Sequence, residues 1–163
     1  MTMLLGRFCH STRVGDDMAP VIRMAEDITE VTEHDLVELR RAALAEPLKR
    51  ARICLHIDDT VLLQEMIIAM HRDTIVLPHR HPCKAESLHV LTGSMELIFF
   101  DDRGEEQRRI RMDAGSPSLS PIVRINKAIW HSINVLSEFV VVHEVTLGPF
   151  DSNSTELAEW NYC

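Results

Sequence analysis

The most informative stretch of the chain is His79–Glu86, which reads HRHPCKAE. His79 and His81 are two residues apart, so on an extended strand both side chains point to the same face, with Cα atoms about 6.5 Å apart. Both imidazoles can then reach one ion at about 2.0–2.1 Å. After His81 a short loop returns the chain, and Glu86 opens the next strand beside the histidines. The spacing therefore predicts a metal site.

A fourth ligand has to come from elsewhere in the chain, and His131, which follows Trp130, is the best-placed candidate. Three imidazoles and one carboxylate leave one or two positions open on a metal that accepts five or six ligands. An open position is what binding or catalysis requires. Two alternatives remain at this point: a lone histidine pair can simply be polar residues on a solvated strand, and Cys83 is either a further ligand or an ordinary loop thiol.

Outward from this stretch, the chain from Arg52 onward alternates short apolar runs with turn residues, a pattern typical of a small β-barrel or jelly roll. The turns are expected at 92–94, 101–104 and 113–117. We expect strands at the following ranges: Ile53–Ile57, Leu63–Met70, Thr74–His81, Glu86–Leu91, Met95–Phe100, Gln107–Met112, Ile122–Asn126, Ala128–Val135 and Phe139–Leu147.

A helix is predicted over residues 29–48, with Thr32 as its N-cap, apolar Leu36, Leu39 and Ala43 at helical spacing, and Pro47 as its stop. The expected organisation is a single domain. It comprises an N-terminal arm at 1–28, the helix at 29–48, a β-barrel at 49–150 and a C-terminal tail at 151–163.

Composition and net charge limit the classes of partner and the cellular location that we expect. The chain has 163 residues, of which 45% are hydrophobic and 26% charged, as in globular domains. A formal net charge of −8 argues against nucleic acid or an anionic membrane surface as a partner. Residues 1–6 are too short for a signal peptide, and no window is long and apolar enough to span a membrane. We expect a cytoplasmic protein whose four scattered cysteines form no disulfide.

The pattern of His79, His81, Glu86 and Gly93 matches the first motif of the cupin superfamily over its ligand-bearing part. The chain therefore resembles cupins, and the resemblance implies an all-β, double-stranded β-helix with the metal inside the barrel. The sequence departs from the family pattern at a few positions. Asp73 replaces the glycine that opens the first motif, and in the second motif the proline and glycine are replaced by Asn126 and Ala128, while Asn134 falls one position early.

A closer resemblance covers most of the chain after Glu46. The blocks that carry it are Pro47–Arg52, Leu55–His56, His79–Pro82 with Lys84, Glu86–Ser87, His89–Leu91, Trp130–His131, His143–Val145, Gly148–Asp151 and Ala158–Trp160. With these blocks the chain looks like the WbuC family of small cupin-fold metalloproteins, for which the Gly148–Asp151 segment is the specific part. This resemblance implies the fold, a metal and a link to bacterial O-antigen gene clusters, without naming a substrate.

Three polar residues are candidates for the acid or base of a reaction: His56, Gln64 and His143. Each is equally well an ordinary polar residue. His89 lies three residues after Glu86, so strand alternation places it on the opposite face, on the surface or in packing.

Cationic and aromatic residues near the motif offer further contacts. Arg80 and Lys84 could meet an anionic group, although Arg80 should face outward and Lys84 is most simply a solvated loop charge. Trp130 and Trp160 could stack on a sugar ring, but packing is the commoner role of tryptophan.

These residues support two functions. The first is a metalloenzyme that isomerises, epimerises or oxygenates a sugar-derived substrate. The second is a non-catalytic module that binds or senses a small ligand through the metal, and the lack of a general base would favour it. One divalent ion is expected, with iron or zinc ahead of manganese, nickel or copper. By analogy with other cupins, we also expect a homodimer.

Overall fold

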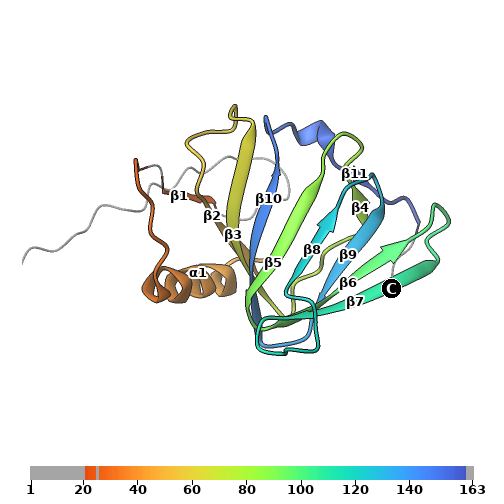
Figure 1. Ribbon diagram of the computed structural model, residues 1–163, viewed down its shortest axis with the longest axis horizontal. Coiled ribbons are helices and arrows are strands. Elements are labelled where there is room, and N and C mark those ends of the chain that lie inside the picture. Colours follow the sequence, from red (N-terminus) through yellow and green to blue (C-terminus); the bar gives the residue numbers. More distant parts are fainter. Residues whose placement is uncertain (1–20, 25, 161–163) are drawn as a thin grey trace, which may run out of the picture.

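The computed structural model describes residues 21–24 and 26–160, which form two β-sheets with a helix on the outside (Figure 1). The first sheet has the order β1-β2-β3-β10-β5-β8, and the second has the order β11-β4-β9-β6-β7. In chain order the elements are β1 (Val21–Arg23), α1 (Glu33–Ala45), β2 (Arg50–Cys54), β3 (Leu63–His71), β4 (His79–Arg80), β5 (Glu86–Thr92), β6 (Ser94–Phe100), β7 (Glu106–Asp113), β8 (Ile122–Ile125), β9 (Trp130–Val135), β10 (Phe139–Leu147), the 3₁₀ turn η1 (Ser152–Ser154) and β11 (Glu156–Leu157).

The main core lies between the two sheets. Val90 and Val142 from the first sheet are fully buried together with Met95 and Leu97 from the second. Strands remote in sequence pair to build these sheets: β10 lies antiparallel between β3 and β5, which is the crossed connectivity of a jelly roll. The predicted all-β jelly roll of the cupin type is confirmed.

Helix α1 covers the outer face of the first sheet beside β2 and β3. Thr32 is its N-cap, as predicted, and shares a capping box with Asp35. The helix ends at Ala45 because Glu46 takes up the extended conformation that a following proline favours. Leu39 and Ala43 are fully buried on the face that meets the sheet. The helix is thus shorter than the predicted range 29–48.

The strand expected at Thr74–His81 is wrong in extent, because only His79 and Arg80 are in a strand. Pro78 interrupts it, since proline has no backbone N–H to donate to a ladder. The preceding segment is held by side chains instead: Ser132 Oγ donates a hydrogen bond of 2.6 Å to the carbonyl of Val76. Ile75 and Leu77 point outward and are 72% and 49% exposed.

Some sequence expectations concern the chain ends. Most of the predicted arm 1–28 lies outside the described residues, which begin with β1 pairing parallel to β2. The tail forms η1 and β11, and β11 pairs with β4. Cys54 is a buried free thiol and Cys83 an exposed one, whereas Cys9 and Cys163 are not among the described residues. Among the described helices none has the length and apolar character of a membrane span.

Candidate metal centre

The four predicted ligands come from both sheets and converge between them. His79 on β4 pairs directly with His131 on β9 in the second sheet. Glu86 is the first residue of β5 in the first sheet and points inward, as the alternating burial of that strand shows. His81 follows β4 immediately and lies beside them. The structure therefore brings together all four residues that the sequence singled out.

The three histidines lie close enough to share one ion. One ligand nitrogen from each of His79, His81 and His131 lies within 4.8 Å of the other two. The ring centroids of His79 and His131 are 4.3 Å apart, and that of His81 is 5.1 Å from His79 and 5.8 Å from His131. A metal ion held by imidazole nitrogens lies about 2.0–2.1 Å from each of them, so the three rings would move closer together around a bound ion.

Hydrogen bonds fix which nitrogen of each ring points inward. Nδ1 of His131 is 2.9 Å from the carbonyl oxygen of Ile129, and Nδ1 of His79 is 2.9 Å from that of Leu77. A carbonyl oxygen only accepts, so each Nδ1 carries the proton and each Nε2 keeps its lone pair. Nδ1 of His81 is held by the Thr155 hydroxyl at 3.2 Å. Such outer partners are usual for histidines that bind metals.

Glu86 supplies the second sign that the site fits a cation. Its Oε1 atom is buried and accepts no hydrogen bond from any residue that the structure describes, yet it lies only 3.0 Å from Nε2 of His131. Its Oε2 atom is 3.7 Å from Nε2 of His81. With the Nδ1 proton of His131 committed to Ile129, a neutral imidazole and the carboxylate would face each other as two acceptors. Either a second proton on His131 or a metal ion between them resolves this conflict.

The pKa values of these groups follow from burial and from the neighbouring charges. Burial, with the adjacent His131, lowers the pKa of His79 to about 4. Burial also lowers the pKa of His81. For His131 burial acts in the same direction, but the Glu86 carboxylate outweighs it and raises the pKa. Burial alone would raise the pKa of Glu86, but the surrounding histidines lower it. His79 and His81 are therefore neutral donors at physiological pH, ready to coordinate.

The predicted acid–base candidates lie at different depths. Gln64 on β3 is buried and donates to the carbonyl of Val61 at 2.9 Å. His56 is buried, and its Nδ1 lies 3.0 Å from the carbonyl oxygen of Glu65. His143 sits on the outer face of β10, where its Nε2 is 2.8 Å from Oε1 of Glu65. Of these three, Gln64 lies on the same interior face as Glu86. Both residues pair with Thr146, from opposite sides of β10.

Glu144 follows His143 on β10 and is a polar residue on the inward face of the strand. It was not among the functional residues predicted from the sequence. Strand alternation turns it inward with Val140 and Val142, which belong to the core between the sheets. The signal was available in the sequence, because a glutamate at this spacing continues an apolar face with a charge. Burial, reinforced by the charge of Glu86, raises the pKa of Glu144 to about 7.

Other residues near the motif lie outside the site. His89 is on the face of β5 opposite Glu86, as strand alternation predicts. Arg80 turns outward, with its guanidinium carbon 4.4 Å from the ring centroid of Trp130 and its Nε donating to Glu156 at 2.6 Å. Trp130 also meets Trp160 edge to face, with centroids 4.8 Å apart. These contacts give the two tryptophans a packing role.

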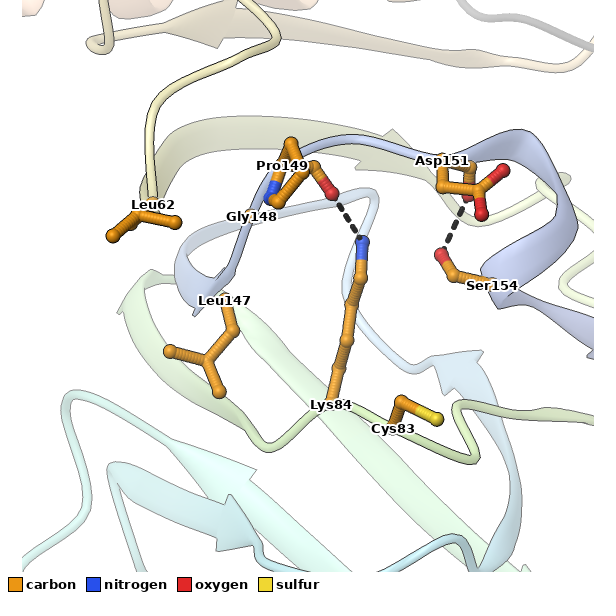
Figure 2. A pocket seen from close by; sticks show the side chains of 8 residues that line it. All are labelled: Leu62, Cys83, Lys84, Leu147, Gly148, Pro149, Asp151 and Ser154. Carbon is orange, nitrogen blue, oxygen red and sulfur yellow. Dashed lines mark hydrogen bonds between the residues drawn. The ribbon is translucent and has the colours of Figure 1, made fainter.

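A pocket of about 390 Å³ lies between the 82–85 loop and the segment after β10 (Figure 2). Figure 2 shows the Lys84 side chain extended across it, with Nζ donating to the carbonyl of Pro149 at 3.2 Å. The residues that line it are Leu62, Cys83, Lys84, Leu147, Gly148, Pro149, Asp151 and Ser154. Cys83 and Lys84 fall between His81 and Glu86 in the chain, but none of the lining residues is a predicted ligand.

Comparison with known families gives one match. A family model described as "Domain of unknown function (DUF6016)" matches residues 31–112, which is half of the chain. This stretch contains α1, β2 to β6 and most of β7, and with them three of the four predicted ligands. No curated protein matches the chain in sequence.

Solved structures share the fold at low sequence identity. The chain is similar to L-ribose isomerase of Cellulomonas parahominis, with 14% identity and a TM-score of 0.53 over 68% of this chain and 69% of the isomerase. A protein of Shewanella oneidensis gives 12% identity and a TM-score of 0.53 over 65% and 72%. The capsular polysaccharide assembling protein CapF of Staphylococcus aureus gives 19% and 0.55 over 68% of this chain, which spans only 32% of CapF. The shared feature is the cupin fold.

Proposed function

The chain belongs to the DUF6016 family, and from its histidine cluster we propose that it is a metal-dependent protein that acts on a small, sugar-derived molecule. His79, His81, His131 and Glu86 are the proposed ligands. The observation that carries the proposal is the common direction of the three imidazoles. Their Nδ1 atoms are held by Leu77, Thr155 and Ile129, which leaves the Nε2 atoms for coordination.

The donor set favours iron or zinc, with manganese, nickel and copper as alternatives, because imidazole and carboxylate suit these ions. A bound ion of this kind acts as a Lewis acid on a carbonyl or hydroxyl oxygen of a ligand. His79, His81, His131 and Glu86 would hold the ion between the sheets, above the buried apolar core. Four protein ligands leave room for a ligand oxygen in a five- or six-coordinate site.

Supporting evidence for a sugar-derived ligand comes from two of the structural neighbours. One is named an L-ribose isomerase and was solved with L-ribose, and CapF is named for capsular polysaccharide assembly. Kinship with the WbuC family and a place in O-antigen synthesis are part of the same proposal. The alternative function, a non-catalytic binding module, is less favoured because Glu144 supplies an interior carboxylate.

The metal content of untagged protein tests the proposal. We expect about one ion of iron or zinc per chain in the natural sequence, and its loss in the His79→Ala/His81→Ala double variant. His89→Ala is the matched control, because His89 lies on the other face of β5. Metal-free natural protein that also fails to bind iron or zinc under anaerobic conditions would contradict the proposal. Equal metal loss in the control would contradict the ligand assignment.

A further inference from the structure

Glu144 places a carboxylate inside the barrel, one strand away from the proposed metal ligand Glu86. On β10 it pairs with Met66 of β3 and with Leu88 of β5, both of which are buried. The inward neighbours of Glu144 on its own strand are Val142 and Thr146. An ionisable side chain on such a face reduces the stability of the fold unless it is paired. A glutamate that is kept there despite this cost is a candidate functional residue.

The register fixes where Glu144 stands relative to the site. Glu86 pairs with Thr146, so Glu144 is the diagonal neighbour of Glu86 across the β5–β10 pair, about 7–8 Å away. Two glutamate side chains are long enough to approach the same region from Cα atoms at that separation. A molecule of a few carbon atoms bound at the histidines can therefore touch Glu144 as well.

Exposure on the inward face of the first sheet decreases from Glu144 to the next row. Glu144 is partly exposed, whereas Val90 and Val142, one row further down the sheet, are completely buried. The polar side chains thus form a layer at the open end of the barrel, over an apolar floor.

The charges around Glu144 suit proton transfer. Burial and the negative charge of Glu86 favour its neutral form, while Arg52 and His131 favour its ionised form. The pKa of about 7 that results lets one carboxyl group take up and return a proton under the same conditions.

We propose that Glu144 is a catalytic residue that moves a proton between adjacent carbons of a small α-hydroxycarbonyl compound, such as an aldose or ketose. The inference rests on the proposed function, and it selects isomerisation over oxygenation. The Glu144 carboxylate takes the proton from the carbon next to the carbonyl. The electron pair of that C–H bond forms a C=C bond, and the carbonyl π electrons move to oxygen. Glu144 then returns the proton to the former carbonyl carbon, where the C=C electron pair forms the new C–H bond. The hydroxyl proton of the neighbouring carbon passes to the other oxygen, and the O–H electron pair that remains forms the new C=O bond, so no oxidant is consumed.

The test compares natural protein, Glu144→Gln and Glu144→Asp, each with its own purified metal content measured. Glu65→Gln is the control, because Glu65 faces outward beside His143. Dihydroxyacetone in D₂O is the probe, and NMR follows deuterium incorporation at carbon. Calorimetry with glycolohydroxamate, which mimics the enediol form of the probe, gives a second readout that does not depend on turnover.

We expect the natural protein and Glu65→Gln to exchange the probe, and Glu144→Gln to lose exchange by about 100-fold or more with its metal retained. Glycolohydroxamate should bind about tenfold more weakly to Glu144→Gln, because a hydrogen bond to a charged group is lost. Glu144→Asp, which keeps a carboxylate, should retain part of the exchange.

Each other outcome is decisive. Undiminished exchange or unchanged glycolohydroxamate binding in Glu144→Gln overturns the role of Glu144, as does metal-loaded natural protein that exchanges no probe. Loss of metal in both Glu144 variants makes Glu144 a structural or ligating residue instead. Natural protein that neither contains metal nor binds iron or zinc under anaerobic conditions refutes the proposed function itself, which is a separate failure.

Discussion

Single residues determine whether the histidines can converge. Each ring of the site is oriented by one oxygen atom outside it, and two of these oxygens are backbone carbonyls of residues two positions earlier, Leu77 and Ile129. Leu77 and Ile129 lie just before β4 and β9, so the orientation of these two rings is built into the local backbone that leads into each strand. The third oxygen belongs to the side chain of Thr155 and can be removed by substitution.

Thr155→Val should weaken metal binding by about tenfold, because outer partners of ligating histidines contribute 10- to 100-fold in affinity. The expected cause is a less constrained His81 ring. Competition with a chromophoric chelator measures the affinity, and Thr60→Val, in a surface loop, is the control. Equal affinities in the two variants would show that Thr155 does not orient His81.

Gly93 is the glycine of the first motif, and its conformation explains why a glycine stands there. Its φ angle is +78°, and an added Cβ would lie 2.2 Å from the carbonyl oxygen of Phe139. Gly93→Ala should therefore destabilise the fold by about 2–4 kcal/mol through backbone strain and overlap. Urea unfolding measures this, with Gly115→Ala as the control, because a Cβ there meets an atom only at 3.4 Å. Equal stabilities would contradict the overlap.

Among the elements, the second sheet is held on its outer face by a charged cluster across three strands. Glu96 on β6 accepts hydrogen bonds from Arg109 of β7 at 2.6 Å and from Asn134 of β9 at 2.9 Å. The Asn134 hydrogen bond and the Arg109 charge lower the pKa of Glu96 below its ordinary value of 4.5. A lowered pKa in the folded state means that the ionised form stabilises the fold.

Glu96→Gln should cost about 1 kcal/mol of stability at neutral pH. The difference is fully present above pH 4.5. It shrinks as the pH falls through the lowered pKa, because natural Glu96 is then protonated too. Urea unfolding at neutral pH and at about pH 3 measures both values. Glu105→Gln, in the exposed turn before β7, serves as the control, and a difference that does not depend on pH would contradict the charge argument.

Elements also show how far the sequence predicts the fold. The N-cap Thr32 and the stop at Pro47 were predictable because they act locally, although the predicted range 29–48 extends beyond both ends of α1. The start of β4 at His79 was not predictable, because Pro78 acts together with the Ser132 hydroxyl from a distant strand. The convergence of the histidines and Glu86 followed from motif spacing. The ring orientations did not, since they depend on backbone carbonyls placed by turns.

For the whole molecule, the proposed ligands join the two sheets. Glu86 belongs to the first sheet, and His79 and His131 belong to the second. An ion bound by all of them would connect the sheets at the open end of the barrel, where polar groups replace the apolar core. Metal binding should therefore stabilise the native state as a whole.

Removing the metal with EDTA should lower the unfolding temperature by on the order of 10 °C. An ion present at about 1,000 times its Kd contributes about 4 kcal/mol, and 1 kcal/mol corresponds to about 2–4 °C for a domain of this size. Thermal unfolding followed by circular dichroism measures the shift. The His79→Ala/His81→Ala variant should show no response to EDTA, and a response of equal size would place the metal elsewhere.

The pocket of Figure 2 has a consequence for how this family can diverge. Its walls come from the 82–85 loop and the segment after β10, whereas His79, Glu86 and His131 lie on strands with fixed partners. Mutations in the walls can accumulate without disturbing the strand pairing. Substitutions in the walls would change the shape and charge of the pocket without changing the proposed ligands, so two chains with the same histidines can differ in the compounds that they bind.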